Sequence, residues 1–285
     1  MKPAPFRYHA PKTIEEALSV LARVAPDDGR VLAGGQSLVP TMAFRLARPR
    51  HLVDINGVAG LDRIESRDGK LCIGACVRHA TFHRPVVAGP LGRLLAEVVQ
   101  HIAHHPIRTR GTFCGSIAHA DPASEWCLVA VALGAEMVAR SARGERVIAA
   151  EDFFDAIMTT ALEDNELLRE VRLPLLAADT RFGFYEFSRR AGDFAIAMAF
   201  ATYRVKDSRI VEPRVAIGGV EAFPRRVAEA ESVLSGQATS AELFAAAGDA
   251  AAKVIDPLDD ENIGVEYRRG LVRTVVRRAL ERAAA

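Results

Sequence analysis

The chain has 285 residues with 37 lysines and arginines against 36 aspartates and glutamates, and 49% of its residues are hydrophobic. Its length exceeds the usual domain size of about 100–200 residues and predicts two domains, while its balanced charge disfavours a nucleic-acid-binding or disordered protein. No apolar run could span a bilayer and residues 1–10 lack the apolar core of a signal peptide, so we expect a cytoplasmic protein.

The first strong local signal is a capping box at Thr13 and Glu16, which predicts a helix over residues 14–24. A strand ending at residues 30–33 follows, and then the glycine pair Gly34–Gly35. Ser37 is expected to cap a helix over residues 38–46. The glycines permit positive φ and let a ligand lie on the backbone, and N–H groups at a helix start suit a phosphate. An ordinary connecting turn is the simpler interpretation of this segment alone.

The middle of the chain alternates strands and helices. We expect strands over residues 51–55 and 70–77 and a helix over residues 90–101. Three histidines, His101, His104 and His105, stand at the end of that helix, but no carboxylate or cysteine lies at a matching spacing, so a zinc site is disfavoured. The four cysteines show no CxxC spacing, and any iron–sulfur cluster is therefore expected on another chain.

A second stretch rich in small residues covers positions 108–125. The small residues are Gly111, Thr112, Cys114, Gly115 and Ser116. Asp121 is expected as the N-cap of a helix that extends to Gly134, with Pro122 in its first position. Asp121 and Glu125 lie about one turn apart and could form an acid–base pair, but a cap and a first-turn acid are the simpler interpretation.

The last third of the chain predicts a separate α+β unit. Pro174 and the segment after it mark the expected boundary between domains at residues 1–176 and 177–285. Three strands are expected over residues 180–187, 194–205 and 209–220, and three helices over residues 226–234, 240–254 and 267–284, giving a three-stranded antiparallel sheet with a helical layer. The arginine-rich final helix is interpreted as a solvated face.

With these stretches in view, the chain resembles the FAD-binding medium subunits of the molybdenum hydroxylases, such as carbon monoxide dehydrogenase and bacterial xanthine dehydrogenase-like enzymes. The resemblance is collinear over essentially the whole chain. It rests on FRYHAPKTIEEAL at the start, AGGQSLVPTM, LVDIN, IRTRGTFCGSIAHADPASE, ELLREVRLP and SRRAGDFAIA. One such segment would be weak, whereas the series in the right order makes chance similarity improbable.

The resemblance implies a fold and a set of cofactor contacts. The implied fold is a two-part FAD-binding domain of the PCMH type followed by the smaller C-terminal domain. The implied contacts with FAD, its diphosphate included, are Leu32, Ala33, Gly34, Gly35, Gln36, Ser37 and Leu38 in one segment and Thr112, Gly115 and Ser116 in another. Glu125 matches an acidic residue that contacts the cofactor's sugar, Ile102 and Leu168 match apolar residues of the flavin site, and Tyr185, Arg189 and Arg190 match the region near the ring.

Two residues depart from the family pattern. Cys114 replaces the first glycine of the usual GG pair, and Ser116 replaces the usual asparagine. A Cβ restricts φ, and serine has a shorter hydrogen-bonding reach than asparagine. The departures predict weaker FAD binding rather than its loss.

The implied function is electron transfer within a larger enzyme. A large partner chain would carry molybdopterin, a small partner chain would carry iron–sulfur clusters, and FAD held here would serve an external acceptor, in a dimer of heterotrimers. We nominate no catalytic acid, base or metal ligand in this chain. A flavin-free scaffold subunit and a self-contained flavin oxidase are the alternatives, and the sequence names neither substrate nor acceptor.

Overall fold

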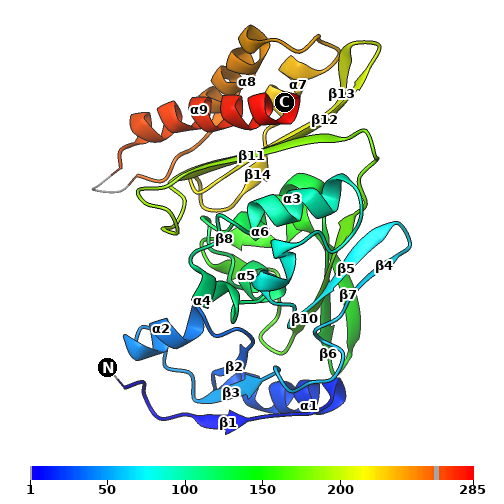
Figure 1. The fold of residues 1–285 in the computed structure, drawn as a ribbon. Coiled ribbons are helices and arrows are strands. Elements are labelled where there is room, and N and C mark those ends of the chain that lie inside the picture. The colour runs from blue at the N-terminus through cyan, green and yellow to red at the C-terminus, as the bar shows by residue number, and fades with distance from the viewer. Residues whose placement is uncertain (1, 260–262) are drawn as a thin grey trace.

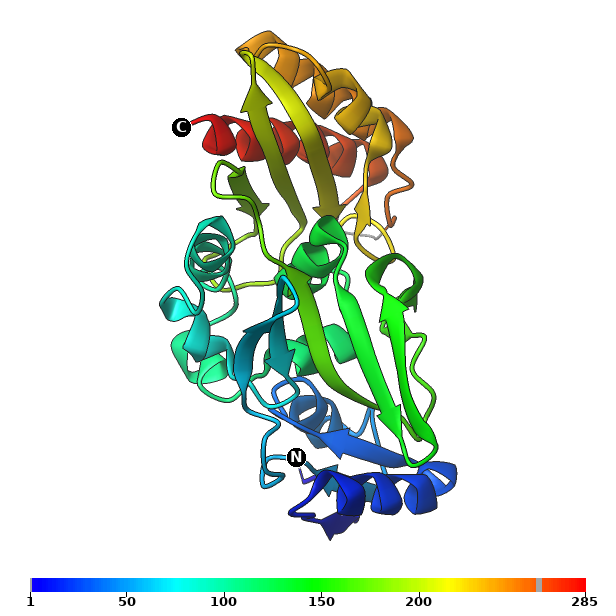
Figure 2. The ribbon, with the colours of Figure 1, turned by 90° about the vertical axis from the view of Figure 1, so that its right-hand side faces the viewer.

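The computed structural model of the protein describes residues 2–259 and 263–285. The three larger sheets of the described residues follow one another along an elongated molecule, with the N-terminus at one end and the last helix at the other (Figures 1 and 2). In these residues no helix has both the length and the apolarity needed to cross a bilayer. The α+β architecture and its two-part first half agree with the prediction from sequence.

The first sheet is parallel, with strand order β1-β3-β2. Its elements are β1 (Arg7–His9), α1 (Ile14–Val24), a 3₁₀ turn (Ala25–Asp27), β2 (Gly29–Leu32), α2 (Leu38–Ala43) and β3 (His51–Asp54). The predicted α1 is confirmed, and the Thr13 hydroxyl accepts from the Glu16 N–H as the capping box requires. Helix α2 is shorter than predicted, because Arg45 adopts a φ of 61° and the chain leaves the helix after Ala43.

The second sheet is antiparallel, with order β4-β5-β10-β6-β7. Its strands are β4 (Ile64–Arg67), β5 (Lys70–Gly74), β6 (Glu136–Ser141), β7 (Gly144–Ala149) and β10 (Leu167–Pro174). Around it lie 3₁₀ turns (His79–His83, Ala150–Asp152), the pair β8 (Phe154–Ala156) and β9 (Thr159–Thr160), and α3 (Pro90–Val98), α4 (His105–Arg108), α5 (Phe113–His119) and α6 (Glu125–Leu133).

The helices of this region correct two predictions. Helix α3 ends at Val98, and the predicted terminal residue His101 lies outside it, while His104 caps the separate α4. Helix α6 starts at Glu125 with Ser124 as its N-cap, so the predicted cap at Asp121 is wrong. Asp121 instead accepts from the Ala123 N–H in a tight turn.

Within the described residues the C-terminal sheet has four strands rather than the predicted three, in the order β11-β12-β13-β14. Its elements are β11 (Arg181–Phe187), β12 (Ala197–Lys206), β13 (Arg209–Gly218), β14 (Arg225–Arg226), α7 (Ala228–Leu234), α8 (Ala241–Val254) and α9 (Val265–Ala284). The additional strand β14 has only two residues, which is too short to leave a periodic signal in the sequence.

Strand β12 joins the two halves of the molecule, because its side chains alternate between two hydrophobic cores. Ala199 and Ala201 contribute to the core beneath α7, α8 and α9. Met198 and Phe200 point to the other face and belong to the core of the preceding region. The two halves therefore share a buried apolar interface.

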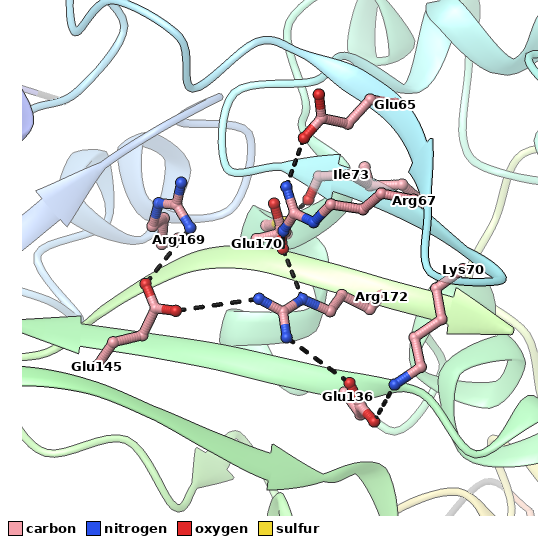
Figure 3. Close-up of polar contacts among 10 residues, drawn as sticks. Glu65, Arg67, Lys70, Ile73, Glu136, Glu145, Arg169, Glu170 and Arg172 are labelled. Carbon is pink, nitrogen blue, oxygen red and sulfur yellow. Dashed lines mark hydrogen bonds and ion pairs between the residues drawn. The ribbon is translucent and has the colours of Figure 1, made fainter.

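One face of the second sheet carries a row of charged side chains instead of apolar ones (Figure 3). Glu170 on β10 lies between Arg67 and Arg172, and Arg172 also approaches Glu136 and Glu145. The alternate residues, such as Val171, point into the core. The second sheet therefore has one face that packs on the core and one polar face covered by ion pairs.

Candidate functional site

The first glycine-rich loop starts where β2 ends. Strands β2 and β3 are parallel, so their carboxyl ends lie at the same edge of the sheet, and the Ile55 N–H donates to the Leu32 carbonyl at 3.0 Å. The chain then turns through Gly34 and Gly35, and Gly35 has a φ of 70° that favours glycine. The loop is thus presented beside the residues that follow β3.

The backbone of this loop has unused hydrogen-bond donors. None of the N–H groups of residues 34–38 has an acceptor within the part of the chain that the structure describes. The Gln36 side-chain amide donates to the Gly34 carbonyl at 3.0 Å, which folds the loop on itself. A run of open backbone donors is suited to a polyanionic group such as a diphosphate.

The second loop connects α4 to α5 and is mostly satisfied internally. The N–H groups of Arg110 and Gly111 donate to the Ile107 carbonyl, at 3.1 and 2.8 Å. Thr112 caps α5 by accepting from the Gly115 N–H at 3.1 Å. Among the described residues, the N–H group of Thr112 in this loop and that of Cys114 in the first turn of α5 have no acceptor.

A buried histidine supports the second loop from below. The His79 N–H donates to the Gly111 carbonyl at 3.0 Å, and the ring Nδ1 accepts from the Trp126 Nε1–H at 3.0 Å. Burial lowers the pKa of His79 to about 4, so the ring is neutral and can accept this bond at physiological pH. The ring also fills the space beside Gly111, where a Cβ would lie 2.6 Å from it.

The two loops are in direct contact. A Cβ on Gly34 would lie 2.5 Å from the Arg110 carbonyl oxygen and 2.6 Å from the Gly111 Cα. Only a residue without a side chain allows this approach. The structure therefore brings the first predicted segment, residues 32–38, together with the second, at Thr112 and Gly115.

Cys114 and Ser116, which the sequence places in a glycine-rich turn, lie in helix α5. Cys114 lies in α5, where any residue fits the backbone, and its thiol points into the core and donates to the Ile73 carbonyl at 3.4 Å. Ser116 shares a 2.8 Å hydrogen bond with Ser124, the cap of α6. The Cβ of Cys114 therefore imposes no unusual turn.

Glu125 is buried at the junction of the two halves, against Glu186 of β11. Burial raises the pKa of both carboxyl groups, and the neighbouring Glu125 raises that of Glu186 further. Oε2 of Glu186 is buried and has no hydrogen-bond partner among the described residues. The raised pKa values favour a proton on this pair, because two neighbouring buried carboxylates repel each other. Nδ1 of His101 lies 3.9 Å from Oε2 of Glu186, and burial lowers the pKa of this histidine.

The remaining predicted residues are spread around the loops. Ile102 and Leu168 are buried in the core of the first region. Arg190 lies on the exposed loop after β11, where it pairs with Asp193 at 3.6 Å. Tyr185 projects from the opposite face of β11 to Glu186, with the Arg282 guanidinium 4.8 Å from its ring centroid. The structure does not bring Tyr185 to the loops.

The loop that carries Arg189 and Arg190 reaches the first region. A Cβ on Gly192 would lie 2.3 Å from Cε1 of His104, the N-cap of α4, so this loop packs on the helix that leads to Arg110. In Figure 1, α2, α4 and the loop after β11 lie along the same side of the molecule. Sequence reasoning did not identify His79 or Glu186, because their partners are far apart in the chain.

Two family models match nearly the whole chain. Residues 4–176 match the FAD-binding domain in molybdopterin dehydrogenase, and residues 182–283 match the C-terminal domain of the CO dehydrogenase flavoprotein. The chain is 40% identical to the nicotine 6-hydroxylase medium subunit of Paenarthrobacter nicotinovorans, over 100% of this chain and 99% of that protein. It is 35% identical to the carbon monoxide dehydrogenase medium chain of Hydrogenophaga pseudoflava, over 99% and 98% of the two chains.

Solved structures agree with these matches. Carbon monoxide dehydrogenase from Hydrogenophaga pseudoflava superposes with a TM-score of 0.94 at 35% identity, over 100% of this chain and 99% of that chain. Quinoline 2-oxidoreductase from Pseudomonas putida 86 superposes with a TM-score of 0.92 at 35% identity, with the same coverage.

Proposed function

This chain belongs to the FAD-binding medium subunits of the molybdenum hydroxylases, and from this premise we propose that its two contacting loops hold the cofactor. The observation that carries the proposal is the run of open N–H groups over residues 34–38. The diphosphate would accept from these donors, and Gly34 and Gly35 leave the backbone accessible to it.

The second loop would complete the site. Its open N–H groups, those of Thr112 and Cys114, stand next to the first loop because Gly34 contacts Arg110 and Gly111. Gly115 and Ser116 lie within the first turns of α5, and Glu125 follows in α6. We assign Leu32, Ala33, Gln36, Ser37, Leu38, Ile102 and Leu168 to the walls of the site, with Arg190 above it.

When bound, FAD supplies the electron-carrying chemistry, and this chain supplies binding and orientation. We infer that substrate is oxidised at molybdopterin on a large partner chain, and that electrons reach this subunit through iron–sulfur clusters on a small partner chain. They then pass to an external acceptor. A dimer of heterotrimers is the proposed assembly.

The domain division proposed from the sequence, 1–176 and 177–285, places the boundary directly after β10. All four cysteines are unpaired and buried, as is usual in a reducing compartment, and this supports a cytoplasmic location.

The alternative of a flavin-free scaffold was supported by the two departures from the family pattern, Cys114 and Ser116, and the structure weakens this support. The side chain of Cys114 enters the core instead of crowding the loop. A self-contained flavin oxidase would turn over substrate without partner chains, which provides its discriminating test.

The absorption spectrum of the purified chain tests the proposed function. We expect a flavin spectrum, FAD released on denaturation, no substrate turnover by the isolated chain, and co-purification with two partner chains. A folded, colourless chain that does not bind added FAD would contradict the proposal.

A further inference from the structure

Two polar side chains, Asn56 and Arg78, bridge the two loops. The Asn56 side-chain amide donates to the Ala33 carbonyl of the first loop at 2.7 Å. Arg78 donates through one nitrogen to the Arg110 carbonyl of the second loop, and through the other to the Asn56 side-chain oxygen at 2.6 Å. One chain of hydrogen bonds thus runs from loop to loop.

This bridge is anchored to the first sheet. Asp54, the last residue of β3, accepts from the Asn56 N–H at 2.9 Å and from its side-chain amide at 2.5 Å. The Tyr8 hydroxyl of the β1 segment donates to the other carboxylate oxygen. Burial alone would raise the pKa of Asp54, but the hydrogen bonds from Tyr8 and Asn56 outweigh it and keep the carboxylate ionised.

The bridge also determines which way the first loop presents its donors. In a planar trans peptide the C=O and N–H groups point in opposite directions. Asn56 holds the Ala33 carbonyl toward β3, so the Gly34 N–H of the same peptide group is turned away from Asn56. That N–H is the first of the open donors of residues 34–38.

We propose that Asn56 and Arg78 form a clamp that fixes the two loops in the arrangement that binds FAD, so that they act as positioning residues for the cofactor. This inference rests on the proposed function, since it assumes that the two loops form the site. In the clamp the arginine is needed for its two separate donors, which reach two acceptors at once.

A simpler role for Arg78 is general attraction of a negatively charged ligand, and the conservative variant separates the two. Arg78→Lys keeps the positive charge but has a single nitrogen on a different stem, and it cannot span the Arg110 carbonyl and the Asn56 oxygen in the same way. The clamp predicts that Arg78→Lys binds FAD more weakly than wild type, whereas attraction alone predicts wild-type affinity.

The experiment is an FAD titration of the flavin-free full chain, followed by flavin fluorescence. We expect Asn56→Ala and Arg78→Ala each to weaken binding about tenfold or more, the loss typical of a hydrogen bond to a charged group. Because both side chains belong to one bridge, the double variant should bind FAD only slightly more weakly than the single variant with the lower affinity. The matched control is Arg84→Ala, since Arg84 is exposed and makes no hydrogen bond or ion pair within the described residues.

Amide hydrogen exchange without FAD gives a second readout. The clamp predicts faster exchange of the His79 and Phe113 N–H groups in both alanine variants, because these groups hold the second loop. Wild-type FAD affinity in Arg78→Lys, additive losses, or unchanged exchange would overturn the clamp. If wild type itself fails to bind FAD, the proposed function fails, and the exchange data still report whether the clamp orders the loops.

Discussion

The two loops of the proposed site contact one another, yet they differ in how their backbones are satisfied. In the first loop the N–H groups of residues 34–38 have no acceptor among the described residues. In the second loop most N–H groups are bonded internally, and Thr112, His79 and Trp126 support it from within the protein. The first loop therefore leaves its donors to water or a ligand, whereas the second loop is held in place by the protein itself.

This difference separates two kinds of substitution. Changes in the first loop should reduce ligand affinity more than they reduce the stability of the ligand-free chain. Changes beneath the second loop should reduce stability first, because they remove contacts that exist without a ligand. The predictions below test this separation in order of expected effect.

The largest effect is expected for Gly34→Ala. The added Cβ would lie 2.5 Å from the Arg110 carbonyl oxygen, so the loops must move apart. We expect FAD affinity, measured by titration, to fall about 100-fold, the consequence of losing about 2.7 kcal/mol. The matched control is Gly270→Ala in α9, where a Cβ meets no described atom within 4 Å. Wild-type affinity in Gly34→Ala would contradict the close contact.

The next effect is on stability, through Trp126→Phe. The substitution removes the donor to Nδ1 of the buried His79 and leaves that nitrogen unsatisfied. We expect the free energy of unfolding of the ligand-free chain to fall by about 1–3 kcal/mol in a denaturant titration. FAD affinity should fall less than in Gly34→Ala. A loss of affinity without a loss of stability would show that the second loop is not the rigid partner.

A smaller, pH-dependent effect is expected at the junction of the two halves. The pKa of Glu186 is raised in the folded chain, so the folded state binds this proton more tightly than the unfolded state. Stability should therefore fall as pH rises above about 4.5, the ordinary pKa of a glutamate, by at most about 1.4 kcal/mol per pH unit for one proton.

The variant Glu186→Gln checks this origin, because an amide keeps hydrogen-bonding groups in place without ionising. Its unfolding free energy is measured by denaturant titration from about pH 5, just above the ordinary pKa of a glutamate, to about pH 9, near the pKa of Glu186 in the folded chain. It should depend less on pH than that of wild type. An identical pH dependence in the two proteins would exclude Glu186 as the cause.

The smallest effect is expected on the charged face of the second sheet (Figure 3). Glu145 approaches Arg169 at 3.4 Å and Arg172 at 3.9 Å, but it is partly open to water. Glu145→Ala should change the free energy of unfolding by less than about 1 kcal/mol, because exposed ion pairs contribute little. It should leave FAD affinity unchanged. A larger loss would mean that the row of ion pairs acts as a network.

Local signals in the sequence were sufficient for much of the fold. The capping box at Thr13 predicts α1, and the strand expected over residues 70–77 contains β5. Helix α5 was missed because it is only seven residues long and its Gly115 and Ser116 resemble a loop. Strand β14 was missed because two residues carry no period.

For the candidate site, the sequence identified the glycine-rich segments but not the residues that join them. Asn56 and Arg78 bridge loops that are far from them in the chain, and Glu186 meets Glu125 across the two halves. Such contacts depend on tertiary packing, which spacing along the chain does not encode. The LVDIN segment placed Asn56 after a strand, and only the parallel pairing of β2 and β3 shows that it adjoins Gly34.

Amide NMR during an FAD titration tests the central claim most directly. If the diphosphate binds the first loop, the N–H resonances of residues 34–38 should shift strongly and saturate with the flavin signal. Resonances of the second loop's internally bonded groups, such as Gly111, should shift less. Saturable FAD binding that leaves residues 34–38 unperturbed would contradict the proposed site.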